Sequence, residues 1–314
     1  MHESKPVIAV VGAGAVGAYY GGRLAQHGQD VHFLLRSDYA AVAKNGWTIR
    51  SCHGDFTLPP GSMHVYEKPG RMPRADLVIV TLKATANDQY QSLIAPLLKE
   101  STQILTLQNG LGNEDRLAEL FGPQRILGGL AFTCIYRIAP GVIDHIDHGY
   151  IRLGEFVESG TKRAKAIAMM FNSSKVRCDV LSSLRAGRWE KLVWNIPFNG
   201  LGAALDLATD ELIGNPTGEA HVRAVMKEVV SAAKAFGVEL AADVIEQKIA
   251  QTRTMGSYKS SMQLDRHHGR PMEVEAILGE PVRAAAAAGV ATPLMAELYR
   301  LAGVVNLAKC RDCH

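Results

Sequence analysis

The class of fold can be inferred from one segment of the chain, Val7-Ile8-Ala9-Val10-Val11-Gly12-Ala13-Gly14-Ala15-Val16-Gly17. Its first five residues form an apolar run without polar alternation, which is typical of a strand buried on both faces of a parallel sheet. The glycines follow the pattern G-x-G-x-x-G, and the helical pattern after them ends near Gly28. A strand, a glycine turn and a helix in this order predict the first unit of a nucleotide-binding α/β domain.

Each glycine of this turn has its own physical task. Gly12 makes the tight turn, Gly14 lets the backbone approach a pyrophosphate, and Gly17 lets the helix pack closely on the strand. The motif is weak by itself, but its place between a strand and a helix favours dinucleotide binding over a turn that merely packs tightly. The N-terminal N–H groups of the helix would hold the pyrophosphate. Six residues are expected to bind the cofactor here: Gly12, Ala13, Gly14, Ala15, Val16 and Gly17.

The end of the second apolar run, Val31–Leu35, indicates which nicotinamide cofactor binds. An acidic residue at this point would hold the ribose 2′-OH of NAD, whereas an arginine accepts the 2′-phosphate of NADP. Arg36 stands in this place, so we expect NADP rather than NAD, the alternative being an ordinary surface arginine. Ser37 offers a further hydroxyl, and Asp38 is positioned to cap the next helix.

The rest of the chain predicts two domains, in agreement with its 314 residues. Further buried runs favour a parallel sheet, and short β-branched runs between about residues 125 and 181 suggest more strands that close it. From about Ser182 the apolar spacing becomes helical. We therefore expect an α/β Rossmann-type nucleotide-binding domain (1–181) followed by an all-helical domain (182–314). The patterns used are strands at Leu77–Thr81 and Ile104–Leu107, and helices at Thr217–Phe236, at Val282–Ala288 and from Thr292-Pro293.

Composition excludes several classes of protein. The 34 basic and 31 acidic side chains leave a net charge of only +3, which argues against nucleic-acid or membrane-surface binding. No apolar run has the length of a membrane span, and the N-terminus lacks the pattern of a secretory signal. Five scattered cysteines, an odd number, indicate free thiols, and a soluble cytoplasmic protein is the default expectation. No metal site is expected. The tail Cys310-Arg311-Asp312-Cys313-His314 has the spacing of haem attachment, but no export signal accompanies it.

Two polar residues follow the third and fourth apolar runs, where open α/β sheets bind ligands. These are Lys83 and Asn109, the latter in Gln108-Asn109-Gly110. A solvated lysine and a common Asn-Gly turn are the alternative explanations, and from the residues alone they are favoured over a functional role.

Three polar residues at helical spacing form a second group of candidate site residues. Lys191, Asn195 and Asn199 are four residues apart and would share one face of a helix, which suits a polar substrate. A solvated helical face would look the same. Pro197 predicts a kink or break, so the alignment of Asn199 with the other two stays open.

With these motifs in order, nearly the whole chain resembles the ketopantoate reductases (2-dehydropantoate 2-reductases). Each motif is short, and it is their order and spacing that are specific. Two departures stand out: Met272 replaces a small hydroxyl residue before Glu273, and Leu278 replaces an asparagine before Gly279. The matching motifs are Gly12-x-Gly14-x-x-Gly17, Leu82-Lys83-Ala84, Gln108-Asn109-Gly110, Lys191-Leu192-x-x-Asn195 with Asn199, Ser260-Ser261-Met262 with Asp265, and Glu273-Val274-Glu275 with Gly279.

The resemblance implies a role for each matched residue. Lys191 and Glu273 are implied as catalytic. The implied substrate ligands are Asn109, Asn195, Asn199 and Ser261, and Arg36, Lys83 and Asn109 are implied on the cofactor side. The implied reaction is NADPH-dependent reduction of 2-dehydropantoate to pantoate, as in pantothenate and coenzyme A biosynthesis. Reduction of another small 2-oxo acid and a non-catalytic NADP(H) sensor stay open as alternatives, as does a homodimer.

Overall fold

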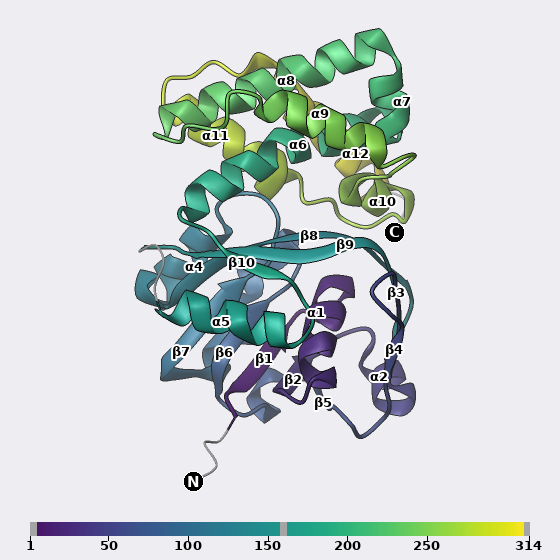
Figure 1. Ribbon diagram of the computed structural model, residues 1–314, viewed down its shortest axis with the longest axis vertical. Helices are drawn as coiled ribbons and strands as arrows, with labels where there is room; N and C mark the ends of the chain where they lie inside the picture. Colours follow the sequence, from purple (N-terminus) through teal and green to yellow (C-terminus); the bar gives the residue numbers. More distant parts are fainter. Residues whose placement is uncertain (1–4, 158–161, 311–314) are drawn as a thin grey trace. The chain divides into compact units, whose positions relative to one another are not determined.

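The computed structural model describes residues 5–157 and 162–310. The chain divides into two compact units, each described separately below (Figure 1). The first unit holds the described residues up to Gln108 together with Asn113–Leu184, and the second holds Asn109–Gly112 and the described residues from Arg185 onward. The segment 109–112 therefore belongs with the residues that follow Leu184 and not with its own neighbours in sequence. The first residues of the N-terminus and the Cys313-His314 end of the tail lie outside the described residues.

The strands of the first unit form one mixed sheet, in the order β4-β3-β9-β8-β7-β6-β1-β2-β5, with β10 paired to β9. The strands expected near Val7, Val31, Leu77 and Ile104 are confirmed as β1, β2, β6 and β7, which are parallel neighbours. The strands are β1 (Val7–Val11), β2 (Asp30–Leu34), β3 (Trp47–Ser51), β4 (Phe56–Leu58), β5 (His64–Tyr66), β6 (Ala75–Val80), β7 (Leu98–Thr106), β8 (Ile126–Ala139), β9 (Val142–Glu155) and β10 (Cys178–Val180).

The expectation of a parallel sheet is wrong for two strand pairs. Strands β8 and β9 are antiparallel and form a long hairpin, and β3 pairs with β4 in the same way. Gly141, at φ +76°, occupies the turn between β8 and β9 and allows the chain to reverse there. The further strands expected between 125 and 181 are confirmed, but most of them pair as a hairpin.

Helices cover both faces of this sheet, which explains why its central strands are apolar throughout. Alternate residues of β1 point to opposite faces: Ile8 and Val10 pack with α1 and α5, whereas Ala9 and Val11 belong to the core formed with α3 and α4. The helices of this unit are α1 (Ala15–Gln26), α2 (Tyr39–Asn45), α3 (Tyr90–Ile94), α4 (Asn113–Phe121) and α5 (Lys162–Ser173). Its short 3₁₀ turns are η1 (Pro69–Arg71), η2 (Ala84–Gln89), η3 (Ala95–Leu97) and η4 (Pro123–Arg125).

The second unit is helical, as expected, and packs around its own apolar core. A kink or break was expected at Pro197, and the first helix, α6 (Leu184–Leu205), continues through that proline without a break. Buried Ile196 and Phe198 on either side of the proline hold the helix against the core, which outweighs the lost backbone hydrogen bond. The remaining helices are α7 (Thr209–Gly214), α8 (Pro216–Ala235), α9 (Val244–Thr254), α10 (Ser261–His267), the π-helical turn η5 (Glu275–Gly279), α11 (Glu280–Ala287) and α12 (Pro293–Cys310).

Two further expectations concern the whole chain. Cys52, Cys134 and Cys178 are free thiols, as the sequence indicates. Within the described residues, none of the helices combines the length and the apolar character that crossing a bilayer requires.

Candidate active site

The glycine turn of the first unit has the geometry that a pyrophosphate site needs. Gly12 lies at φ +90°, and a Cβ there would come within 2.6 Å of the backbone nitrogen of Leu82. A Cβ on Gly17 would come within 2.4 Å of Thr81 Oγ1, so the helix could not pack as it does. Gly14 is exposed, and a Cβ there would meet only the carbonyl oxygen of Gly12, at 3.9 Å. The three glycines therefore fit the three tasks expected of them.

The N-terminus of α1 keeps its positive end uncompensated. Its first turn contains no acidic residue, and no side chain caps it. Thr81 donates a hydrogen bond from Oγ1 to the carbonyl oxygen of Gly12 (2.8 Å) and so fixes the turn from the end of β6. A helix N-terminus of this kind favours an anion. The residues present fit the pyrophosphate of a dinucleotide.

The residues after β2 differ from expectation at one point. Arg36 is exposed, as a phosphate ligand would be. Asp38 precedes α2, but its side chain does not cap that helix. It is buried instead and forms an ion pair with Arg137 of β8. Lys83, at the start of η2, is exposed.

In the second unit, Lys191 is hydrogen-bonded to Asn109. Lys191 Nζ donates to Asn109 Oδ1 at 2.8 Å. Lys191 lies on α6 and is half-buried, while Asn109 belongs to the short segment 109–112. Two residues that are 82 positions apart in the sequence are thus brought together.

Burial and neighbouring charges lower the pKa of Lys191. Desolvation is the main cause, the buried Arg188 lowers the pKa further, and Glu273 opposes both, so that the pKa falls to about 7. Glu273 is itself buried, with 5% of its surface exposed. A lysine with a pKa near neutrality can donate and accept a proton at physiological pH.

The segment 109–112 is held by the turn η5, which begins two residues after Glu273. Gly110 lies at φ +88°, and a Cβ there would come within 2.2 Å of the carbonyl oxygen of Ala276. Leu111 donates its backbone N–H to that same carbonyl (2.9 Å). Because π-helical turns are rare and occur often at functional sites, this contact marks η5 as part of the site.

The two asparagines of α6 have different surroundings. Asn199 Nδ2 donates to the carbonyl of Asn195, and Asn199 Oδ1 accepts from Ser261 Oγ (3.4 Å) and from the backbone N–H of Met262 (3.2 Å). Asn199 therefore anchors the start of α10. The carboxamide of Asn195 shows no hydrogen bond to the residues that the structure describes, although only 6% of Asn195 is exposed.

The two departures from the family pattern lie in the core. Met272 is 2% exposed and Leu278 is fully buried, and both pack in the apolar core of the second unit. These residues fill volume, so their identity bears on packing and not on the polar groups around Lys191.

Sequence reasoning missed two features of the site. Arg188 precedes Lys191 by three residues, and this helical spacing was the available signal. Gln108 accepts hydrogen bonds from Tyr90 and Thr106 and donates to Asn87 (2.9 Å), which fixes the chain just before Asn109. No periodicity reveals that second network, since its members come from separate elements.

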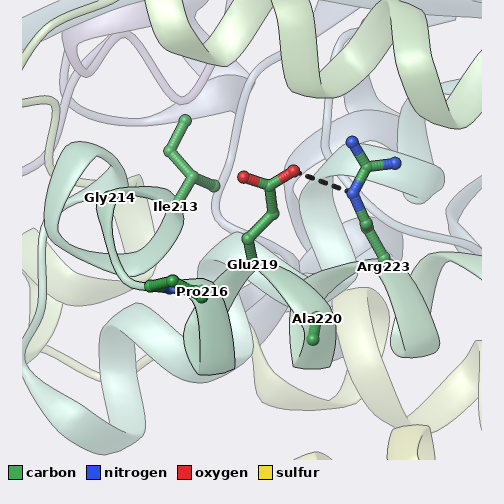
Figure 2. A pocket seen from close by; sticks show the side chains of 6 residues that line it. All are labelled: Ile213, Gly214, Pro216, Glu219, Ala220 and Arg223. Carbon is green, nitrogen blue, oxygen red and sulfur yellow. Dashed lines mark hydrogen bonds and ion pairs between the residues drawn. The ribbon is translucent and has the colours of Figure 1, made fainter.

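A hollow elsewhere in the second unit does not coincide with this site. Figure 2 shows it at the junction of α7 and α8, where the Arg223 side chain donates to Glu219 at 2.9 Å. Both charged groups have further partners, since Arg253 donates to Glu219 and Arg223 donates to Glu246. The hollow contains none of the predicted site residues. Its lining is Ile213, Gly214, Pro216, Glu219, Ala220 and Arg223.

Comparisons with known proteins agree with this arrangement. The family described as ketopantoate reductase PanE/ApbA matches residues 8–158, and its C-terminal counterpart matches residues 183–306. The 2-dehydropantoate 2-reductase of Nostoc sp. is 40% identical, and the match covers 95% of this chain and 94% of that protein. The crystal structure of 2-dehydropantoate 2-reductase from Geobacter metallireducens is 47% identical, with a TM-score of 0.92 over 94% of this chain and 98% of the other. The corresponding structure from Methylococcus capsulatus is 34% identical, with a TM-score of 0.87 over 96% and 97%.

The fold and the site define an oxidoreductase: an α/β unit with a dinucleotide-type glycine turn, followed by a helical unit that gathers a lysine, a carboxylate and carboxamides. Its homologues at 40–47% identity over nearly the full length are 2-dehydropantoate 2-reductases. The chain belongs to the ketopantoate reductase PanE/ApbA family.

Proposed function

We propose that this chain reduces 2-dehydropantoate to pantoate with NADPH, in the cytoplasm, as a step of pantothenate and coenzyme A biosynthesis. The observation that carries the proposal is the half-buried lysine held by a carboxamide oxygen beside a buried carboxylate: Lys191, Asn109 and Glu273. Homology at 40–47% identity supports the substrate. The proposed domains are residues 1–181 for the cofactor and 182–314 for the substrate and catalysis.

The proposed cofactor site consists of the glycine turn, Arg36 and Lys83. The exposed backbone at Gly14 and the uncapped start of α1 suit a pyrophosphate, and exposed Arg36 suits a 2′-phosphate. When bound, NADPH supplies the hydride for the C2 carbonyl carbon. We place Lys83 and Asn109 on the cofactor side because of the family match.

Lys191 acts as the proton donor in this proposal. Negative charge develops on the carbonyl oxygen as the carbon is reduced, and the ammonium group stabilises this charge and then protonates the oxygen. With a pKa of about 7, roughly half of the lysines carry the proton at neutral pH. Asn109 holds the Nζ atom in place, and the Glu273 carboxylate favours the protonated form.

The remaining polar groups hold the substrate. The Asn195 carboxamide and the Ser261 hydroxyl bind the carboxylate and hydroxyl ends by hydrogen bonds. Asn199, which is bonded to the start of α10, positions Ser261 and contributes to substrate binding through it.

Cofactor consumption tests the proposal. The purified chain is mixed with NADPH and 2-dehydropantoate, and the absorbance of the reduced nicotinamide is followed, with NADH and other small 2-oxo acids in parallel. We expect rapid loss of absorbance with 2-dehydropantoate and NADPH. Faster turnover of another 2-oxo acid would instead favour that substrate, and tight NADPH binding without any turnover would favour a sensor. Light scattering of the same sample distinguishes a homodimer from a monomer.

A further inference from the structure

An ion pair with a buried carboxylate lies two positions in the sequence from the residue proposed to select the cofactor. Asp38, two positions after Arg36, is only 5% exposed. Arg137 donates from Nη1 to Asp38 Oδ1 and to Ser37 Oγ (3.2 Å), and Ser37 Oγ donates to Asp38 Oδ1 (3.0 Å). Arg137 comes from the far end of β8, 99 residues from Asp38. The fold thus brings a distant arginine to the end of β2.

The charge at this place decides which dinucleotide is favoured. A carboxylate near the end of the second strand favours a free ribose 2′-OH and repels a 2′-phosphate. Asp38 would have this effect if it stood alone. The positive charge of Arg137 neutralises the Asp38 carboxylate. Because this carboxylate already accepts hydrogen bonds from Ser37 and Arg137, it is less able to accept one from a ribose hydroxyl.

Arg137 also has donors to spare. Its side chain is 37% exposed, and its bonds to Ser37 and Asp38 both use Nη1. A guanidinium has five N–H donors in a planar fork that suits a phosphate. The Ser37 hydroxyl accepts a hydrogen bond from Arg137, and exposed Arg36 immediately precedes Ser37 in the sequence. Together these residues offer an anion two cationic groups.

We propose that Arg137 is a second specificity-determining residue for NADP(H). Held in place by Ser37 and Asp38, it supplies the second positive charge of the 2′-phosphate subsite and neutralises the carboxylate that would otherwise favour NAD(H). This inference rests on the proposed use of NADPH. It adds to the role of Arg36 a residue that lies about a hundred positions away in the chain.

Binding of two small nucleotides tests the inference without any turnover. Isothermal calorimetry measures the affinity for 2′,5′-ADP, which carries a 2′-phosphate, and for ADP, which lacks it. We expect Arg137→Met to lower the affinity for 2′,5′-ADP about tenfold or more, since a charge-assisted contact is lost. The affinity for ADP should stay within about twofold of the wild-type value. Arg36→Ala should act in the same direction. Arg50→Met, which removes an exposed arginine paired with Asp144 in the same unit, is the matched control and should change neither affinity.

A second variant covers the case in which Arg137→Met folds poorly because Asp38 is left buried without its partner. The double variant Asp38→Asn with Arg137→Met lacks that carboxylate. We still expect it to have a lower affinity for 2′,5′-ADP and an unchanged affinity for ADP. Wild-type affinity of this double variant for 2′,5′-ADP, or equal losses for both nucleotides, would overturn the role of Arg137. A wild-type protein with no preference for 2′,5′-ADP would overturn the NADPH assignment itself, and the role of Arg137 with it.

Discussion

Two charged side chains shift the pKa of Lys191 in opposite directions. Desolvation by burial has the largest effect and lowers the pKa. Arg188, one helical turn earlier, lowers it further, while Glu273 raises it. A proton donor is most effective when its pKa is close to the working pH. Arg188 and Glu273 therefore help to set the pH range in which Lys191, the proposed proton donor, carries its proton.

This balance predicts opposite effects of two substitutions on the pH dependence of kcat. The ammonium form is the active one, so kcat falls as the pH rises through the pKa of Lys191. Arg188→Met removes a repelling cation and raises that pKa, so the alkaline limb moves to higher pH. Glu273→Gln removes an attracting carboxylate and moves the limb to lower pH. Steady-state kinetics across pH measure both shifts. If the alkaline limbs of the two variants coincide with that of the wild type, or move in the same direction, the assignment of Lys191 is contradicted.

At the scale of elements, the site depends on one tight contact between two segments. The segment 109–112 meets η5 at Gly110 and Ala276, and only a glycine fits there because of its positive φ and the 2.2 Å approach of a Cβ to the Ala276 carbonyl. This contact carries Asn109 to Lys191. The position of Lys191 Nζ, the proposed proton donor, is thus linked to the backbone of a loop.

Gly110→Ala should therefore impair both stability and turnover. The strained φ alone costs about 1–3 kcal/mol, and the clash with Ala276 adds to it. Gly122→Ala is the matched control, because Gly122 has a similar φ of +92° and nothing within 4 Å of its Cβ position. We expect denaturant unfolding to show a larger loss for Gly110→Ala, and kcat to fall only in that variant. Equal stability losses with unchanged kcat in both variants would show that the loop does not position Lys191.

At the scale of the whole molecule, the sequence predicts what local patterns encode. Apolar runs located β1, β2, β6 and β7, and helical spacing located α8, α11 and α12. The strands β4 and β5 escaped prediction because three residues carry little periodicity. Strand β3 alternates buried and exposed residues, whereas the strands that were located are continuous apolar runs. The antiparallel pairing of β8 and β9 depends on the turn at Gly141, which a parallel interpretation overlooks.

The candidate site likewise has features that local sequence patterns predict and features that depend on tertiary packing. The glycine turn and the Lys191 face of α6 could be read from spacing, whereas the pairing of Lys191 with Asn109 spans 82 residues and depends on tertiary packing. Local rules likewise misplace two side chains. Asp38 pairs with Arg137 instead of capping α2, and Pro197 remains inside α6, because long-range contacts outweigh the local preference in both places.

The proposed function depends on Lys191 as the proton donor in the reduction of 2-dehydropantoate. The most direct measurement compares kcat of the wild type and Lys191→Ala with NADPH and 2-dehydropantoate, together with NADPH affinity by calorimetry. Loss of a general acid lowers kcat by about 10²- to 10⁴-fold, and we predict such a loss with nearly unchanged NADPH affinity. A Lys191→Ala protein that turns over 2-dehydropantoate at a rate near that of the wild type would show that Lys191 is not the proton donor.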